Sequence, residues 1–156
     1  MATSNTAKNP PSDYALVETP VAASKAPTKR GILLVEYEVP LRALLSEVME
    51  RRGIPLWTAV NVADALDMFH EHGPSIAVVV IEQSLPEWNG PLLWQVLHRL
   101  RPSVKGCMIT EDGSAPDAID VENLGLAATF AKPLQLDDMI RVLEELTAKA
   151  NAEAEV

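Results

Sequence analysis

The chain has 156 residues, 47% of them hydrophobic, which is enough for one domain with a buried core and too few for two. No apolar run is long enough to cross a bilayer, and no apolar stretch follows basic residues at the N-terminus, so we expect neither a membrane anchor nor a signal peptide. We therefore expect a cytoplasmic protein. The single cysteine, Cys107, lies in an apolar run and is expected to be a buried thiol.

The net charge is −9 and is distributed unevenly. Residues 1–30 carry four basic and two acidic side chains, whereas residues 31–156 carry nine basic and twenty acidic ones. An acidic surface repels the phosphates of nucleic acids, and no predicted helix shows a stripe of Lys and Arg. The charge pattern therefore argues against nucleic-acid binding and favours protein partners.

Residues 1–29 are rich in Ala, Ser, Thr and Pro and show no apolar periodicity, which predicts a disordered tail. This tail either has no role or acts as a tether or docking segment around Tyr14-Ala15-Leu16-Val17.

Between residues 30 and 148, five short apolar runs alternate with helical stretches, and this alternation is typical of an α/β domain with a parallel sheet covered on both faces. Residues 149–156 are expected to fray. The predicted strands lie at about 31–36, 55–59, 76–82, 106–110 and 127–131.

Apolar residues at helical spacing predict one helix after each strand. The first helix, at about 39–52, ends at Gly53, and the second begins after a possible cap at Asn61. The third spans about 91–100, a weakly apolar fourth about 115–124, and the fifth about 135–148. The residues expected to face the sheet are Leu41, Leu44, Leu45 and Val48 in the first helix, Val62, Ala65, Leu66 and Phe69 in the second, Leu93, Leu97 and Leu100 in the third, and Leu136, Met139 or Ile140, Leu143 and Leu146 in the fifth.

Polar side chains stand where the predicted strands end. Glu36 and Tyr37 follow the first strand, Glu82 ends the third, Thr110 ends the fourth and Lys132 follows the fifth. Because functional groups of open parallel sheets gather beyond the carboxyl ends of the strands, we expect these five residues to converge.

Residues 31–147 resemble the receiver domain of bacterial response regulators. The resemblance rests on the acid Glu36, on Glu82 followed by Pro86 and Gly90, on Thr110 and on Lys132-Pro133. It implies a flavodoxin-like, doubly wound sheet with the strand order 2-1-3-4-5 and a cis peptide before Pro133. It also implies phosphoryl transfer from a phosphohistidine of a partner to an Asp, assisted by Mg²⁺.

Two positions depart from the receiver pattern. Glu82 stands where receivers carry the phosphoaccepting Asp, and Tyr37 stands where they carry a metal-binding Asp. A neutral phenol is a poor Mg²⁺ ligand, and the longer side chain of Glu82 is expected to reach towards Lys132 and Thr110. We therefore expect a degenerate receiver without a catalytic residue or efficient phosphotransfer. Mg²⁺ binding is expected to be weak or lost, with Glu36 and Glu82 as weak metal candidates only. An ion pair between Glu82 and Lys132 is either purely structural or an imitation of the phosphorylated state.

Receivers commonly couple the Thr at the end of the fourth strand to an aromatic ring three residues before the Lys. Here that position is Thr129, so Thr110 is expected to bond locally without acting as a switch. A threonine cannot fill or vacate a pocket as a large ring does.

The sequence therefore predicts a stand-alone, non-enzymatic interaction module that binds a histidine kinase or another two-component signalling protein. The alternatives are a working response regulator that receives a phosphoryl group, and a flavodoxin-like domain that binds a small molecule. Trp88, Leu92 and Val96 are the predicted partner-binding residues, because they fall outside the sheet-facing stripe of the third helix. In the other interpretation, Trp88 and Leu92 fold over Pro86 and Trp94 and close the loop.

Overall fold

The computed structural model describes residues 29–111 and 121–154. It contains one five-stranded sheet in which every strand runs parallel to its neighbours, in the order β2-β1-β3-β4-β5. The predicted fold class and strand order are therefore confirmed. The strands are β1 (Gly31–Val35), β2 (Leu56–Ala59), β3 (Ile76–Glu82), β4 (Lys105–Thr110) and β5 (Ala128–Ala131).

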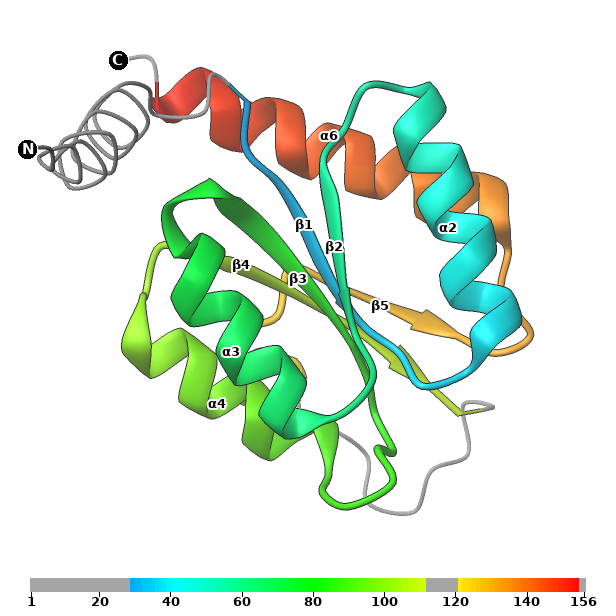
Figure 1. Cartoon of the computed structure of the whole chain (residues 1–156), viewed down its shortest axis with the longest axis vertical. Helices are drawn as coiled ribbons and strands as arrows, with labels where there is room; N and C mark the ends of the chain where they lie inside the picture. Colours follow the sequence, from blue (N-terminus) through cyan, green and yellow to red (C-terminus); the bar gives the residue numbers. More distant parts are fainter. Residues whose placement is uncertain (1–28, 112–120, 155–156) are drawn as a thin grey trace, which may run out of the picture.

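Helices cover both faces of the sheet, with α2 and α6 on one face and α3 and α4 on the other (Figure 1). Side chains of β1 alternate between the two cores, because successive strand residues point to opposite faces. Leu33 and Val35 pack on the α3 and α4 side, while Ile32 and Leu34 pack on the α2 and α6 side. Among the described helices, none combines the length and the apolar character that a membrane crossing needs. The helices are α2 (Val39–Arg51), α3 (Val62–His72), the 3₁₀ turn η2 (Gly73–Ser75), α4 (Gly90–Leu100), α5 (Val121–Leu124) and α6 (Leu136–Ala154).

Local signals explain several helix ends. The predicted cap Asn61 accepts a hydrogen bond from the Asp64 N–H at 2.8 Å and starts α3. Gly53, with φ of 73°, follows the end of α2 in a left-handed conformation that favours glycine. Asn89 caps α4 in the same way as Asn61 caps α3, which the sequence analysis did not anticipate. The predicted fourth helix lies partly outside the described residues, because only Val121–Leu124 of it is described.

Two residues predicted to face the sheet are exposed instead. Leu44 is 39% exposed and Met49 takes its place in the core, so the buried face of α2 is rotated relative to the prediction. Leu100 is 64% exposed, whereas Trp94 is buried. Trp94 lies against Gly106, where a Cβ atom would come within 2.5 Å of the indole ring. The missing side chain in β4 thus makes room for a large ring, whereas Leu100, the last residue of α4, lies outside the core that buries Leu93 and Leu97.

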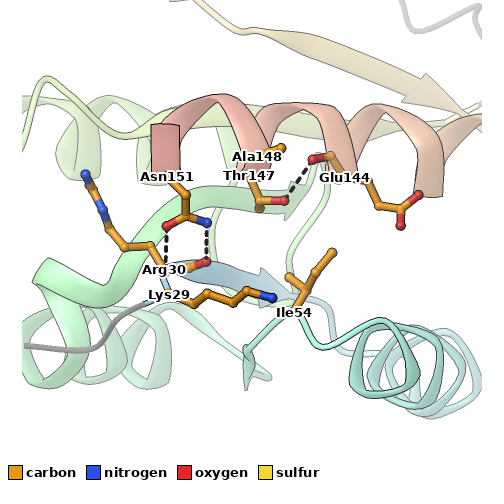
Figure 2. Close-up of a pocket in the computed structure, with 7 residues that line it drawn as sticks. All are labelled: Lys29, Arg30, Ile54, Glu144, Thr147, Ala148 and Asn151. Atoms are coloured by element: carbon orange, nitrogen blue, oxygen red, sulfur yellow. Dashed lines mark hydrogen bonds between the residues drawn. The ribbon is translucent and has the colours of Figure 1, made fainter. Parts of the chain in front are cut away.

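Helix α6 continues to Ala154, six residues beyond the predicted end. The side chain of Asn151 explains the extension, because it pairs with the backbone of Arg30 just before β1 (Figure 2). The Arg30 N–H donates to Asn151 Oδ1 at 2.9 Å, and Asn151 Nδ2 donates to the Arg30 carbonyl at 3.3 Å. Ala150 is buried beside this pair. The predicted tail at 1–29 lies, except for residue 29, outside the described residues.

Candidate functional site

Four of the five predicted polar residues lie together at the carboxyl edge of the sheet. Glu36 directly follows β1, Glu82 is the last residue of β3, Thr110 is the last residue of β4, and Lys132 directly follows β5. The Lys132 Nζ atom lies 2.9 Å from Glu82 Oε1. The Lys132 backbone N–H donates to the Thr110 carbonyl at 3.0 Å, which holds the two strand ends in register. The Lys132-Pro133 peptide is cis, as predicted.

Two carboxyl groups are fully buried beneath this lysine. Glu36 and Glu82 are both 0% exposed. Glu36 Oε2 accepts a hydrogen bond from the Glu38 N–H at 3.0 Å, and the Glu36 carbonyl accepts one from Arg42 Nη1 at 3.0 Å. Glu36 Oε1 and Glu82 Oε2 have no hydrogen-bond partner within the part of the chain that the structure describes. Buried carboxylate oxygens without a donor are costly, and a proton on Glu82 relieves this cost because it allows a hydrogen bond between the Glu82 and Glu36 side chains.

Burial raises the pKa of Glu82 to about 8, and the neighbouring Glu36 carboxyl adds to the increase. The positive charge of Lys132 acts in the opposite direction but does not offset the other two effects. Burial alone would lower the pKa of Lys132, but its contacts with Glu82 and Glu38 raise that pKa above the usual value. Lys132 therefore stays charged near neutral pH, whereas Glu82 holds its proton more tightly than an ordinary glutamate.

Tyr37 does not join the cluster, and Glu38 does. Tyr37 is 41% exposed, whereas Glu38 Oε1 lies 3.2 Å from Lys132 Nζ. The chain leaves β1 in an extended conformation, so residues two apart point to the same side and the residue between them points away. Glu38 was not among the predicted site residues, although this alternation after Val35 was the signal that could have identified it.

Residues 32–144, more than half of the chain, match the family described as the response regulator receiver domain. The chain belongs to this family. It is 28% identical over 143 residues to the sensor kinase CckA of Brucella abortus, and 29% identical over 114 residues to the photosynthetic apparatus regulatory protein RegA of Cereibacter sphaeroides. These matches cover 85% and 73% of this chain, but the chain spans only 15% and 61% of those two proteins. A match at 25% identity to the sporulation initiation phosphotransferase F of Bacillus subtilis covers 69% of this chain and 86% of that protein.

Solved structures of other receivers share the fold. The signal receiver domain of an HD domain-containing protein from Pseudomonas fluorescens superimposes with a TM-score of 0.72 at 20% identity, covering 86% of this chain and 98% of that one. A receiver domain protein from Clostridium thermocellum gives 0.69 at 21% identity, covering 77% and 95%. At these identities the likeness establishes the fold alone.

The receiver family implies Mg²⁺ at this edge of the sheet. Glu36, Glu38 and Glu82 each offer a carboxylate oxygen, and these oxygens lie within 4.8 Å of one another. Carboxylates are suitable ligands for Mg²⁺ by chemical type. However, the ammonium group of Lys132 already contacts Glu38 Oε1 and Glu82 Oε1, which leaves Glu36 Oε1 and Glu82 Oε2 as the unpaired oxygens. The residues present therefore fit a tightly held Mg²⁺ poorly.

The aromatic position of the receiver switch has no ring here. Thr129 is exposed, and the ring of the adjacent Phe130 packs into the core on the α2 and α6 side. Thr110 is half-buried at the end of β4. The ring that Thr110 would need for the usual receiver coupling is thus absent from its expected place.

The predicted partner-binding residues lie together on the outer side of α4. Trp88 is 38% exposed, Leu92 is 40% exposed, and both line a hollow of about 320 Å³ with Val96. Trp94 is buried in the core, whereas Trp88 and Leu92 are both partly exposed. We call this hollow the α4 groove, and its lining residues are Trp88, Leu92, Gln95, Val96, Arg99 and Leu100.

Proposed function

We propose that this receiver is a non-enzymatic, phosphorylation-independent interaction module of two-component signalling. The observation that carries the proposal is the position of Glu82, which is fully buried and within 2.9 Å of Lys132. The side chain at the phosphoacceptor position, Glu82, therefore already contacts Lys132 of the same protein.

The geometry of Glu82 disfavours phosphotransfer. Its carboxyl group lies one methylene further from the backbone than that of Asp, and it already contacts the lysine that receivers direct at the phosphoryl group. In-line attack on phosphorus requires close positioning of the attacking oxygen, and a displacement of about 1 Å can cost about 10²-fold in rate. The same pair limits metal binding, since Lys132 supplies a fixed positive charge where Mg²⁺ would have to enter.

The expected partner is a protein, in particular a histidine kinase or another two-component signalling protein. Residues 31–156 carry twenty acidic and nine basic side chains, which disfavours nucleic acid as a ligand. The α4 groove offers exposed apolar surface, which more often marks an interface than isolated exposed residues do. We assign the partner contact to Trp88, Leu92 and Val96.

Capture of a partner from the native cell tests this proposal when the full chain is the bait. The wild-type chain is compared with Trp88→Ala/Leu92→Glu and with Glu82→Gln, each with and without acetyl phosphate. We expect the wild type to retain one specific signalling protein regardless of acetyl phosphate, and the double variant to lose it while its far-ultraviolet circular dichroism is unchanged. A requirement for acetyl phosphate would refute the proposal. Undiminished capture by the double variant would move the interface elsewhere, to the α5 and α6 side.

The Glu82→Gln bait separates the two interpretations of the Glu82 and Lys132 pair. If the pair imitates the phosphorylated state, Glu82→Gln captures less partner than the wild type above about pH 8, where the wild-type Glu82 is charged. If the pair only neutralises a buried acid, capture is unchanged, because the α4 groove lies outside the cluster.

A working receiver remains a second candidate because of the two unpaired oxygens. Glu36 Oε1 and Glu82 Oε2 are buried without a partner among the described residues, and a cation could bind them. In that case Mg²⁺ would bind at the cluster and a phosphoryl group would be transferred to an oxygen of Glu82. The intact mass of the wild-type chain after incubation with acetyl phosphate and Mg²⁺ distinguishes this candidate from the first.

A further inference from the structure

An apolar stripe runs along α4 and the loop before it and is partly exposed. Trp88, Leu92, Val96 and Leu100 are spaced four residues apart, and Leu100 is 64% exposed. A second hollow, of about 370 Å³, begins on the other side of Leu100 and is lined by Leu66, Phe69 and Pro74 among others. The stripe therefore extends along α4 and past its C-terminal end, and it is suited to an apolar segment in an extended or helical form.

The charge around the apolar stripe indicates which kind of segment would bind there. Helix α4 contains no acidic residue, although the domain as a whole is strongly acidic. Arg99 lines the α4 groove, is exposed, and makes no hydrogen bond or ion pair with any described residue. An apolar segment with flanking acidic residues matches this surface, because the flanking acids would lie near an unpaired cation.

The chain contains one such segment in its own N-terminal region. Residues 13–18 read Asp-Tyr-Ala-Leu-Val-Glu, so an apolar run of four residues stands between two acids. The other apolar residues before Arg30 are interrupted by Pro, Ser, Thr and Lys and lack acidic flanks on both sides.

The chain enters the domain close to the end of the stripe. Arg101, which follows Leu100, donates from Nη2 to the Ile76 carbonyl at 2.9 Å. Ile76 is paired with Gly31 in the sheet, and neighbouring strands are about 5 Å apart. Residues 18–29 span up to about 36 Å when extended, whereas a helix of the length of α4 spans about 16 Å. Residues 13–18 can therefore reach any part of the α4 groove of the same molecule.

We propose that residues 13–18 occupy the α4 groove, with Leu16 and Val17 on the apolar stripe and Glu18 near Arg99. A short tether gives the segment an effective concentration in the millimolar range, so a weak contact suffices for substantial occupancy. A partner that binds the same groove has to displace the segment, which makes the segment a competitive regulator of that site. This regulatory part rests on the proposed function, whereas the docking itself does not.

Paramagnetic relaxation in the full chain tests the docking. A nitroxide is attached to the cysteine introduced by Ser12→Cys, and the methyl signals of the domain are compared before and after reduction of the label. Cys107 is fully buried, and burial raises its pKa to about 12, so thiol reagents are expected to modify only the introduced site. We expect selective loss of the Leu92 and Val96 methyl signals. Leu44, which is exposed on α2 across the sheet, serves as the reference (Figure 1).

The matched control keeps the label and changes the segment to Leu16→Glu/Val17→Glu, which should restore the Leu92 and Val96 signals. Equal effects on Leu92, Val96 and Leu44 would overturn the proposal. Signal loss in a mixture of labelled chains and unlabelled, isotope-enriched chains would also overturn it, because the occupant would then belong to a second copy. The relaxation experiment does not involve a partner. If residues 13–18 do not dock, the assignment of the partner contact to Trp88, Leu92 and Val96 is still tested by partner capture.

Discussion

The replacement Glu82→Gln is expected to change how stability depends on pH. Glu82 is fully buried, and burial raises its pKa from 4.5 to about 8. Between these two values the folded protein holds a proton that the unfolded chain releases. The folded state is therefore favoured at low pH, and this contribution is lost as the pH rises from about 4.5 to about 8.

The size of the effect follows from the two pKa values. A rise from 4.5 to about 8 corresponds to at most about 5 kcal/mol in the free energy of unfolding, at 1.36 kcal/mol for each factor of ten in proton affinity. The glutamine side chain does not titrate, so the variant lacks this contribution. The free energy of unfolding of the wild type minus that of the variant should therefore fall by several kcal/mol between pH 4.5 and pH 8.

Urea denaturation followed by circular dichroism at a series of pH values measures this difference. Glu50→Gln, an exposed acid on α2, is the matched control and should show a difference that is nearly independent of pH. If the wild type gains stability relative to Glu82→Gln as the pH rises, the ion pair with Lys132 outweighs burial and the reasoning about this carboxyl group is wrong.

Three further results are expected. Millimolar Mg²⁺ should leave the tryptophan emission of the wild type unchanged, because Lys132 contacts the carboxyl groups of Glu38 and Glu82, and Trp88, in the loop after β3, would report a change there; Tyr37→Asp/Glu82→Asp, which restores both acids of the receiver pattern, should gain a saturable response. Asn151→Ala should lower the free energy of unfolding by about 1–3 kcal/mol in urea denaturation, since the backbone of Arg30 loses both of its hydrogen bonds to that side chain. Cys107 should resist thiol reagents at pH 8 in the folded protein and react fully in urea, because burial keeps the thiol protonated and inaccessible.

Each of these expectations has its own control and contrary result. A saturable quench of the wild-type emission by Mg²⁺ would show that the unpaired oxygens of Glu36 and Glu82 bind a cation. Glu153→Ala, an exposed change on the same helix as Asn151, should leave stability within about 0.5 kcal/mol, and an equal loss in both variants would argue against the role of Asn151. Rapid modification of Cys107 without denaturant would mean that β4 opens readily.

The sequence predicts the order of strands and helices well because short-range patterns determine each element. Alternating strand and helix patterns suffice for the parallel sheet, and Asn61 and Gly53 mark their helix ends by side-chain and backbone chemistry that does not depend on distant residues. The burial of Trp94 could not be predicted in this way, because it depends on the space that Gly106 leaves in another element.

In the candidate site, too, some residues could be predicted from short-range sequence patterns and others could not. The positions of Glu82 and Lys132 follow from strand ends, and so does their meeting at one edge of the sheet. The inclusion of Glu38 and the full burial of Glu36 depend on how the loop after β1 leaves the sheet. Asn151 was missed for a related reason, since its partner, the backbone of Arg30, lies 121 positions earlier in the chain.

The most direct test of the central claim is the intact mass of the chain after incubation with acetyl phosphate and millimolar Mg²⁺. The wild type should remain unmodified, because Glu82 is buried and held by Lys132. Tyr37→Asp/Glu82→Asp, which restores both acids of the receiver pattern, is the matched control and should gain the mass of one phosphoryl group if the rest of the site is competent. A hydroxylamine-sensitive phosphoryl adduct on Glu82 of the wild-type chain would contradict the account and establish a working receiver.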